Sequence, residues 1–434
     1  MLLDFETCSV VMEAKKSASA SGRTRHRGGS GRGGKKKAMA RIEGGDGGNS
    51  GRKRIVCGEA AAAAAVEAGG AELEKKKEEL VDIEFGALAK AVTASEDDET
   101  RRAVAESVGR AYGPDGLGIL TVSGVPDVER LRQRLLPLSS KLAGLRKDRL
   151  VLLEDADSSY SVGWSHGKEI LEGGKPDLFK GSFYANPLVN RPTEDVELMR
   201  AHPSYCRPNL WPTEDIPELE DALMELGTLV VHVGEMVGVL CDAYVSSRGV
   251  QGARSLGKII RESKATKARL LHYFPPSADS DAKGESEEGD EPSNWCGWHL
   301  DHGSLTGLVA GMFMDGDTQV SSPDATAGLY IKDRRGVTTK VSFGASQLAF
   351  QIGQASQVHS GGALVATPHC VKGASGTVAT GVARNSFAVF MQPLWDEPMD
   401  LPDGSVDPGV AQWADGVSFG EFTKRTLSNY YSSS

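Results

Sequence analysis

The chain has 434 residues, of which 39% are hydrophobic and 25% charged, and its formal net charge at pH 7 is −10. These proportions are typical of a globular protein with a large core and extensions. The chain contains no run of about 18 consecutive apolar residues, so no membrane span is predicted. The six cysteines form no C-x-x-C pair, which argues against a disulfide framework or a zinc knuckle and favours free thiols in a reducing compartment.

Residues 1–75 form a basic tail rich in Gly and Ser, which we expect to be disordered. Residues 1–60 carry 13 Lys/Arg against 6 Asp/Glu, a balance of +7 that leaves −17 for the rest of the chain. An acidic remainder argues against general nucleic-acid binding. The tail is open to three interpretations: a solvated segment without a role, an organelle transit segment, or a nuclear-localisation patch. We expect an intracellular protein, with the cytoplasm favoured over an organelle or the nucleus.

Residues 76–260 are predicted to mix short strands with helices. Val81–Phe85 and Leu117–Val122 have strand patterns, and Arg101–Tyr112 and Val128–Leu145 have apolar side chains at helical spacing. The second of these helices is expected to bend or break at Pro137.

A long helix is predicted from Pro217 to Val245, because Thr213 and two acids precede it and Pro217 suits a first helical turn. Its interior is apolar on most sides, so we expect it to be buried against a sheet. His232 lies inside this run and is interpreted as a core histidine, not a ligand.

From Lys267 the pattern changes to short strand-like segments separated by Gly, Asp and Pro. This spacing predicts a β-sandwich or jelly roll, and we assign residues 261–395 to it. The acidic segment Ser277–Ser293 is expected to be a surface loop without a specific role. Residues 396–434 are predicted to be a C-terminal extension in which Pro408–Tyr431 is helical.

The segment that begins at His299 carries the strongest chemical signal. Side chains at i and i+2 of a strand face the same side, so His299 and Asp301 would project together. With one more histidine they would form a 2-His-1-carboxylate facial triad, which is typical of non-haem Fe(II) oxygenases. An isolated His-x-Asp is weak evidence, because any strand can supply one by chance. His302 would point away from His299 and is interpreted as a supporting or surface residue.

His359 and His369 compete for the third ligand position. His369 is favoured because Arg384-Asn385-Ser386 follows it at the start of an apolar strand. A guanidinium binds a carboxylate through two hydrogen bonds and a nearby hydroxyl adds a donor, so Arg384 and Ser386 are predicted to hold the far carboxylate of 2-oxoglutarate. An arginine considered alone would more often form a surface ion pair. His359 is interpreted as a turn residue.

The order of these motifs resembles the plant-type 2-oxoglutarate/Fe(II) oxygenases, the superfamily that includes isopenicillin N synthase. The metal segment of that family is H-T-D-x-G-x-L-T-x-L, and this chain has H-L-D-H-G-S-L-T-G-L from His299 to Leu308. The family's N-I-G-D and S-N-G correspond to Gln351–Gln354 and Ser360–Gly362. Its distal histidine follows nine residues after that serine, and the same interval here ends at His369.

Two further motifs extend the resemblance from about Val81 to Pro393. Arg384-Asn385-Ser386 matches the family's R-x-S, and Asn209–Pro212 resembles the N-x-W-P that precedes its long helix. The resemblance implies a mainly β fold with helices: a double-stranded β-helix (jelly-roll) core, an N-terminal helical region and a long buried helix.

The resemblance also implies a function. Fe(II) would be bound by His299, Asp301 and His369, and 2-oxoglutarate by Arg384 and Ser386. The enzyme would be a dioxygenase that uses O₂ to hydroxylate a small organic molecule, with release of succinate and CO₂. Two alternatives are a 2-oxoglutarate-independent oxidase of the isopenicillin N synthase type and a catalytically silent metal-binding jelly-roll protein. Nothing in the sequence names the substrate or separates hydroxylation from desaturation or cyclisation.

Three positions depart from the family pattern. The family often has N-x-Y before a proline, with the tyrosine hydroxyl on 2-oxoglutarate, and Phe274 stands in place of that tyrosine. We therefore expect this hydrogen bond to be missing or supplied from elsewhere. Cys370 replaces the usual arginine after the distal histidine, which we interpret as a packing change. Residues between Met314 and Gly328 look inserted, and they would either shape the substrate pocket or decorate the surface.

Overall fold

The computed structural model describes residues 80–170, 176–275, 295–374 and 380–428. The chain divides into two units, Met1–Glu74 and Lys75–Ser434, and all the described residues belong to the second. The predicted basic tail of residues 1–75 and the predicted acidic loop Ser277–Ser293 lie outside the described residues.

Between Val81 and Glu262 the described residues form four strands and eight helices. They are β1 (Val81–Glu84), α2 (Phe85–Thr93), α3 (Glu99–Tyr112), β2 (Ile119–Ser123), α4 (Val128–Ala143), α5 (Lys147–Val151), β3 (Gly163–His166), β4 (Lys180–Ala185), α6 (Val196–Ala201), α7 (Pro203–Cys206), α8 (Leu219–Ser247) and α9 (Leu256–Glu262). The predicted helices at Arg101–Tyr112 and Pro217–Val245 are confirmed as α3 and α8. The helix predicted from Val128 is α4, and Pro137 lies inside it without ending it, so of the predicted bend or break the break does not occur.

From Lys267 onward the described residues are mostly strands. They are β5 (Lys267–Tyr273), β6 (Cys296–His299), β7 (Leu305–Val309), β8 (Met312–Asp315), β9 (Thr318–Val320), β10 (Gly328–Lys332), β11 (Thr338–Val341), β12 (Leu348–Ile352), α10 (Gln354–His359), β13 (His369–Lys372), β14 (Val382–Met391) and α11 (Phe419–Ser428). The C-terminal helix therefore begins at Phe419, not at Pro408, because residues 408–418 form turns and extended chain.

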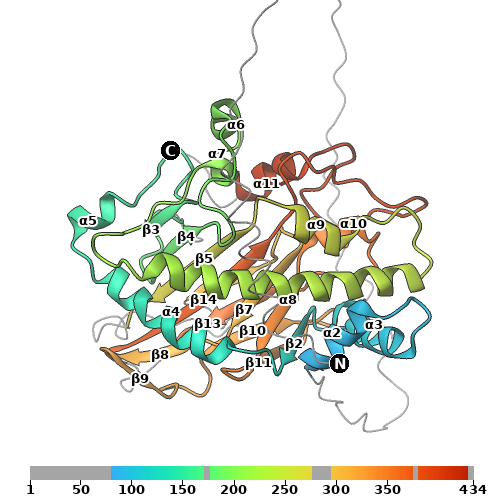
Figure 1. Cartoon of the computed structure of the whole chain (residues 1–434), viewed down its shortest axis with the longest axis horizontal. Helices are drawn as coiled ribbons and strands as arrows, with labels where there is room; N and C mark the ends of the chain where they lie inside the picture. Colours follow the sequence, from blue (N-terminus) through green and yellow to red (C-terminus); the bar gives the residue numbers. More distant parts are fainter. Residues whose placement is uncertain (1–79, 171–175, 276–294, 375–379, 429–434) are drawn as a thin grey trace, which may run out of the picture. The chain divides into compact units, whose positions relative to one another are not determined.

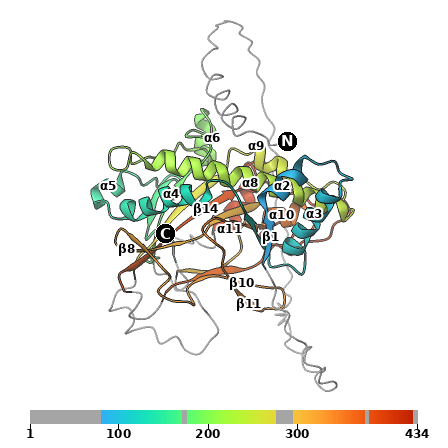
Figure 2. The same cartoon turned by 60° about the horizontal axis from the view of Figure 1, so that its bottom comes forward.

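Two sheets organise these strands. The larger has ten strands with the main order β1-β2-β12-β7-β14-β5-β4-β3, and β8 and β9 extend from β14. The smaller has four, in the order β11-β10-β13-β6. Figure 2 shows α4 and α8 on one side of the larger sheet and β10 and β11 on the other, so the sheet lies between a helical layer and the smaller sheet. The protein is thus a layered arrangement of mixed sheets and helices.

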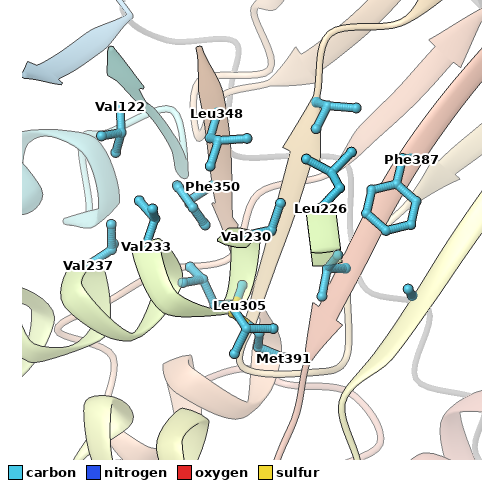
Figure 3. Close-up of a cluster of buried hydrophobic side chains, with 14 of the residues drawn as sticks. Val122, Leu226, Val230, Val233, Val237, Leu305, Leu348, Phe350, Phe387 and Met391 are labelled. Carbon is cyan, nitrogen blue, oxygen red and sulfur yellow. The ribbon is translucent and has the colours of Figure 1, made fainter. Parts of the chain in front are cut away.

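Helix α8 runs along the larger sheet (Figure 1), and its packing explains its apolar sequence. Its Val230, Val233 and Val237 face Phe350 of β12 and Met391 of β14 in the main hydrophobic core (Figure 3). The helix is long and apolar enough to cross a membrane by composition, but 61% of its most apolar window is buried within the fold. A buried core helix passes the same test, and the packing against the sheet identifies α8 as one.

Two histidines of this part differ from their predicted surroundings. His232 was interpreted as a core residue, but it is exposed, because it lies on the side of α8 that faces away from the sheet. His359 was interpreted as a turn residue, but it is the last residue of α10 and is buried. Its Nε2 lies 3.1 Å from the carbonyl oxygen of Pro398, so it donates a hydrogen bond to the C-terminal segment.

Candidate metal centre and ligand cavity

Three of the predicted site residues lie together at one end of the smaller sheet. Each of His299, Asp301 and His369 offers one ligand atom within 4.8 Å of the other two. Asp301 Oδ1 lies 3.9 Å from His299 Nε2 and 3.8 Å from His369 Nε2. The strand register causes this meeting, because His369 opens β13 directly opposite His299, the last residue of β6. Asp301 lies in the following loop, so the prediction of a strand through both His299 and Asp301 was wrong at Asp301.

Hydrogen bonds behind the three residues orient their ligand atoms. His299 Nδ1 lies 2.9 Å from the carbonyl oxygen of Gly297, and His369 Nδ1 lies 3.3 Å from that of Thr367. A carbonyl only accepts, so both Nδ1 atoms carry a proton, and Nε2 is the ring nitrogen that each histidine has left for a metal. Thr306 Oγ1 donates to Asp301 Oδ2 at 2.6 Å, which leaves Oδ1 for the same ion. Such supporting bonds are typical of metal sites.

The charges of the ligand atoms also suit a divalent cation. Burial lowers the pKa of His369 to about 4, so this ring is neutral at pH 7. Burial would raise the pKa of Asp301, but His369 and His299 hold it below its ordinary value. Burial would lower the pKa of His299 as well, but Cys296 raises it to about 9, so a metal must displace a proton there at neutral pH. Two imidazoles and one carboxylate form the donor set that suits Fe(II).

A cavity of about 300 Å³ extends between the sheets from these residues to Arg384 and Ser386 of β14. Arg384 packs 5.3 Å from the ring of Tyr273 and 5.9 Å from that of Trp295. Burial lowers the pKa of Arg384. Within the described part of the chain, no carboxylate forms an ion pair with it. The cavity therefore offers a guanidinium to an anion at the end away from the three ligands.

The turn before β8, the strand that pairs with β14 beside Arg384, limits the position of this guanidinium. A Cβ on Gly311 would lie 2.7 Å from Arg384 Nε, so only glycine allows the arginine to approach this closely. Arg132 of α4 donates to the carbonyl oxygens of Ala310 at 2.6 Å and Gly311 at 2.7 Å and holds this turn in place. Sequence reasoning identified Arg384 and Ser386 but missed Arg132 and Gly311, because their contacts join segments far apart in the chain.

Tyr273 places a hydroxyl group beside Arg384, which fits the second of the two expectations for Phe274, that the hydroxyl is supplied from elsewhere. Phe274 does not line the cavity; its ring lies 4.8 Å from those of His166 and His272. Tyr273, one residue earlier, faces the cavity beside Arg384. Alternation along β5 is the sequence signal that was available, since Leu271 and Tyr273 share a face and both line the cavity.

The remaining predicted residues lie around the site. His302, predicted to be a supporting or surface residue, is half-buried: its ring stacks on Phe419 of α11 with centroids 5.8 Å apart, and burial lowers its pKa to about 4. Cys370 is fully buried, in line with a packing role. The apparently inserted segment includes β9, and its residues Ser322 and Ala327 line the cavity. The cavity wall also includes Gln351, which the sequence analysis treated only as part of a motif.

Several solved structures are similar in fold to this chain. T7H from Neurospora crassa, in complex with alpha-KG (2-oxoglutarate), matches with a TM-score of 0.57 and 18% identity, over 80% of this chain and 96% of that one. A Caulobacter crescentus protein assigned to the 2OG-Fe(II) oxygenase family matches with a TM-score of 0.55 and 18% identity, over 81% and 98%. The dioxygenase for auxin oxidation of rice matches with a TM-score of 0.50 and 18% identity, over 81% and 96%.

These likenesses establish the fold, which is that of the 2-oxoglutarate/Fe(II) oxygenases, and they agree with the resemblance in the sequence. No family model matches the chain, and neither does any curated protein.

Proposed function

We propose that the protein is an Fe(II)- and 2-oxoglutarate-dependent oxygenase, with iron held by His299, Asp301 and His369. We also propose that the two sheets are the two halves of a double-stranded β-helix, as in the oxygenases that share this fold. The observation that carries the functional proposal is the guanidinium of Arg384, which has no ion-pair partner among the described residues and lies at the far end of the cavity from the three ligand atoms. A cation in a partly apolar cavity is costly unless an anion accompanies it, and a dicarboxylate that also reaches the metal satisfies both ends.

Each residue then has a definite task. Arg384 would bind the far carboxylate of 2-oxoglutarate through parallel hydrogen bonds, with Ser386 and Tyr273 adding hydroxyl groups. Apolar side chains of the cavity wall, such as Leu308 and Val341, would exclude water from the reacting atoms. Bound Fe(II) would supply the activation of O₂. One oxygen atom would enter succinate as CO₂ leaves 2-oxoglutarate, and the other would enter the substrate as a hydroxyl group.

The test is the weak visible absorption band of the iron–2-oxoglutarate chelate. Purified protein is loaded with Fe(II) under argon and titrated with 2-oxoglutarate, alongside Arg384→Ala and the control Arg102→Ala, an exposed arginine on α3. We expect the band in the wild type and in the control. Arg384→Ala should need at least about tenfold more 2-oxoglutarate, because a charge-assisted pair is lost.

Failure would take a recognisable form. If Fe(II) binds but no band forms at any concentration, the 2-oxoglutarate assignment is wrong, and a 2-oxoglutarate-independent oxidase or a silent metal-binding protein replaces it. If Arg384→Ala responds like Arg102→Ala, the arginine does not bind the co-substrate.

A further inference from the structure

Gln351 of β12 carries a buried amide group and lines the cavity. It is only 1% exposed, yet neither its Nε2 nor its Oε1 has a hydrogen-bond partner among the described residues. Its chain neighbours Phe350 and Ile352 belong to the hydrophobic core on the α8 side of the sheet, where Figure 3 shows Phe350. Successive side chains of a strand alternate between faces, so Gln351 points the other way, into the cavity that it lines.

The register places this amide near the metal ligands. Gln351 lies directly across from Thr306 of β7, and the hydroxyl of Thr306 donates to Asp301. Thr306 in turn lies across from Phe390 of β14, whereas Arg384 lies at the far end of that strand beside Tyr273. Gln351 is therefore at the metal end of the cavity, where a substrate must present the bond to be oxidised, and not beside the guanidinium proposed for the co-substrate.

The surroundings of Gln351 favour a neutral ligand. Leu308, Leu329, Val341 and Phe343 line this part of the wall with apolar side chains. Two other cations of the cavity lining are already engaged: Arg269 is paired with Glu169 at 2.6 Å, and Lys340 Nζ donates to the carbonyl oxygen of Ala325. A charged group would lose its hydration here without gaining a counter-ion. The amide itself offers one acceptor oxygen and two N–H donors side by side, which match a planar group that has a donor next to an acceptor.

We propose that Gln351 recognises the substrate, and that the substrate presents a cis-amide edge, an N–H beside a C=O, as in a lactam or imide ring. This inference rests on the proposed function, since it names the substrate class of that same site. A site built to hydrogen-bond a ligand rejects the analogue that lacks the donor, because its own polar atoms are then left unpaired. Gln351 thus determines specificity, while the metal ligands and Arg384 serve the chemistry.

The test uses three related probes: 2-quinolone, which has the cis-amide edge, N-methyl-2-quinolone, in which the donor is blocked, and quinoline, which lacks both groups. Binding to the full chain loaded with Co(II) and 2-oxoglutarate is measured by isothermal titration calorimetry. We expect 2-quinolone to bind at least about tenfold more tightly than either analogue. In Gln351→Leu this preference should disappear, whereas Gln133→Leu, an exposed glutamine on α4, should keep it.

Gln351→Glu is a second variant that keeps the shape and removes the N–H donors, and it should lose the preference too. The comparison of probes on the wild type needs no variant, so the test survives if a variant does not fold. Equal binding of 2-quinolone and its N-methyl analogue, or no binding of 2-quinolone, overturns the proposal. A large loss of 2-oxoglutarate affinity in Gln351→Leu overturns it as well, because the amide would then serve the co-substrate.

The test of Gln351 and the test of the oxygenase assignment can be told apart when either one fails. The oxygenase assignment fails when the iron–2-oxoglutarate band is absent, whereas the specificity assignment is read from the ratio of probe affinities. The same calorimetry with Co(II) and without 2-oxoglutarate therefore shows whether lactam recognition stands when the co-substrate assignment does not.

Discussion

The single residues of the metal centre depend on the groups that hold them. Each candidate ligand uses one atom to bond to a neighbour and leaves the other for a metal. Because such bonds fix the orientation of a ligand before the metal arrives, they contribute to affinity without touching the ion. Thr306 orients the metal ligand Asp301 by a hydrogen bond. Gly311 acts differently, because its lack of a side chain leaves room for the guanidinium of Arg384.

Replacing Thr306 by valine should weaken metal binding. Valine keeps the shape of threonine but cannot donate to Asp301 Oδ2. We expect about 10- to 100-fold lower affinity for Co(II), measured by titration of its visible absorption. Thr306→Ser retains the hydroxyl and should stay close to the wild type. Equal affinities in all three proteins would mean that this hydrogen bond does not orient Asp301.

Replacing Gly311 by alanine should weaken 2-oxoglutarate binding and spare the metal. The new Cβ would lie 2.7 Å from Nε and 2.8 Å from Nη2 of Arg384, so the guanidinium must move. We expect at least about a tenfold rise in the 2-oxoglutarate dissociation constant, because small misplacements of a binding group are costly. Arg102→Ala, an exposed residue of α3 outside the site, is the control. An unchanged constant for Gly311→Ala would show that Arg384 has room to adjust.

At the level of elements, β12 has one face in the hydrophobic core and the other in the wall of the cavity. Phe350 packs under α8 in the main core, while Gln351 faces the cavity from the same strand. Helix α8 thereby fixes the position of β12 and β7, and with them Gln351 and Thr306. One face of β12 thus contributes to stability through the core, and the other face contributes to the cavity.

Phe350→Ala should destabilise the protein strongly. Its side chain is fully buried, and its removal leaves a cavity between α8 and the sheet. Losses of about 3–5 kcal/mol are usual for such a change. Chemical unfolding measures the effect, and Val406→Ala, at a side chain that is 81% exposed, should lie within about 0.5 kcal/mol of the wild type. A small effect of Phe350→Ala would indicate that α8 does not anchor the sheet.

Across the whole molecule, the C-terminal segment joins parts that are distant in sequence. Residues 396–428 contact α10 through His359 and Pro398, and Arg254 forms ion pairs with Glu397 at 2.8 Å and Asp400 at 3.1 Å. Phe419 of the same segment stacks on His302, which directly follows the candidate ligand Asp301. The end of the chain therefore supports the loop that carries the metal site.

His359 should make stability depend on pH in a defined window. Burial lowers its pKa from the ordinary 6.5 to about 4, so between these values the unfolded chain binds a proton that the folded chain does not. Stability is therefore fully present above about pH 6.5 and falls as the pH drops towards 4, by up to about 1.4 kcal/mol per pH unit.

The comparison with His359→Gln isolates this contribution, because the other histidines titrate in both proteins. Urea unfolding at several pH values should show a shallower loss between pH 6.5 and 4 in the variant, and equal slopes above pH 7. Parallel curves over the whole range would show that His359 does not titrate with folding.

The sequence by itself determined the parts that depend on local pattern. Helical spacing identified α3, a long apolar run after Pro217 identified α8, and alternation with turn residues identified the strands after Lys267. The spacing of His299, Asp301, His369 and Arg384 also selected four residues that the structure brings to one cavity. These signals can be read from the sequence alone, because each depends on residues a few positions apart or on the fixed order of motifs in the chain.

Only the tertiary structure decided what depends on contacts between distant segments. Pro137 is tolerated within α4, His232 is exposed and His359 is buried, because neighbours from other elements set the environment of each. Strand pairing placed Tyr273 beside Arg384 and Gln351 across from Thr306. A sequence pattern says which side chains share a face, whereas the register between strands says what that face meets, and register is a property of the packed molecule.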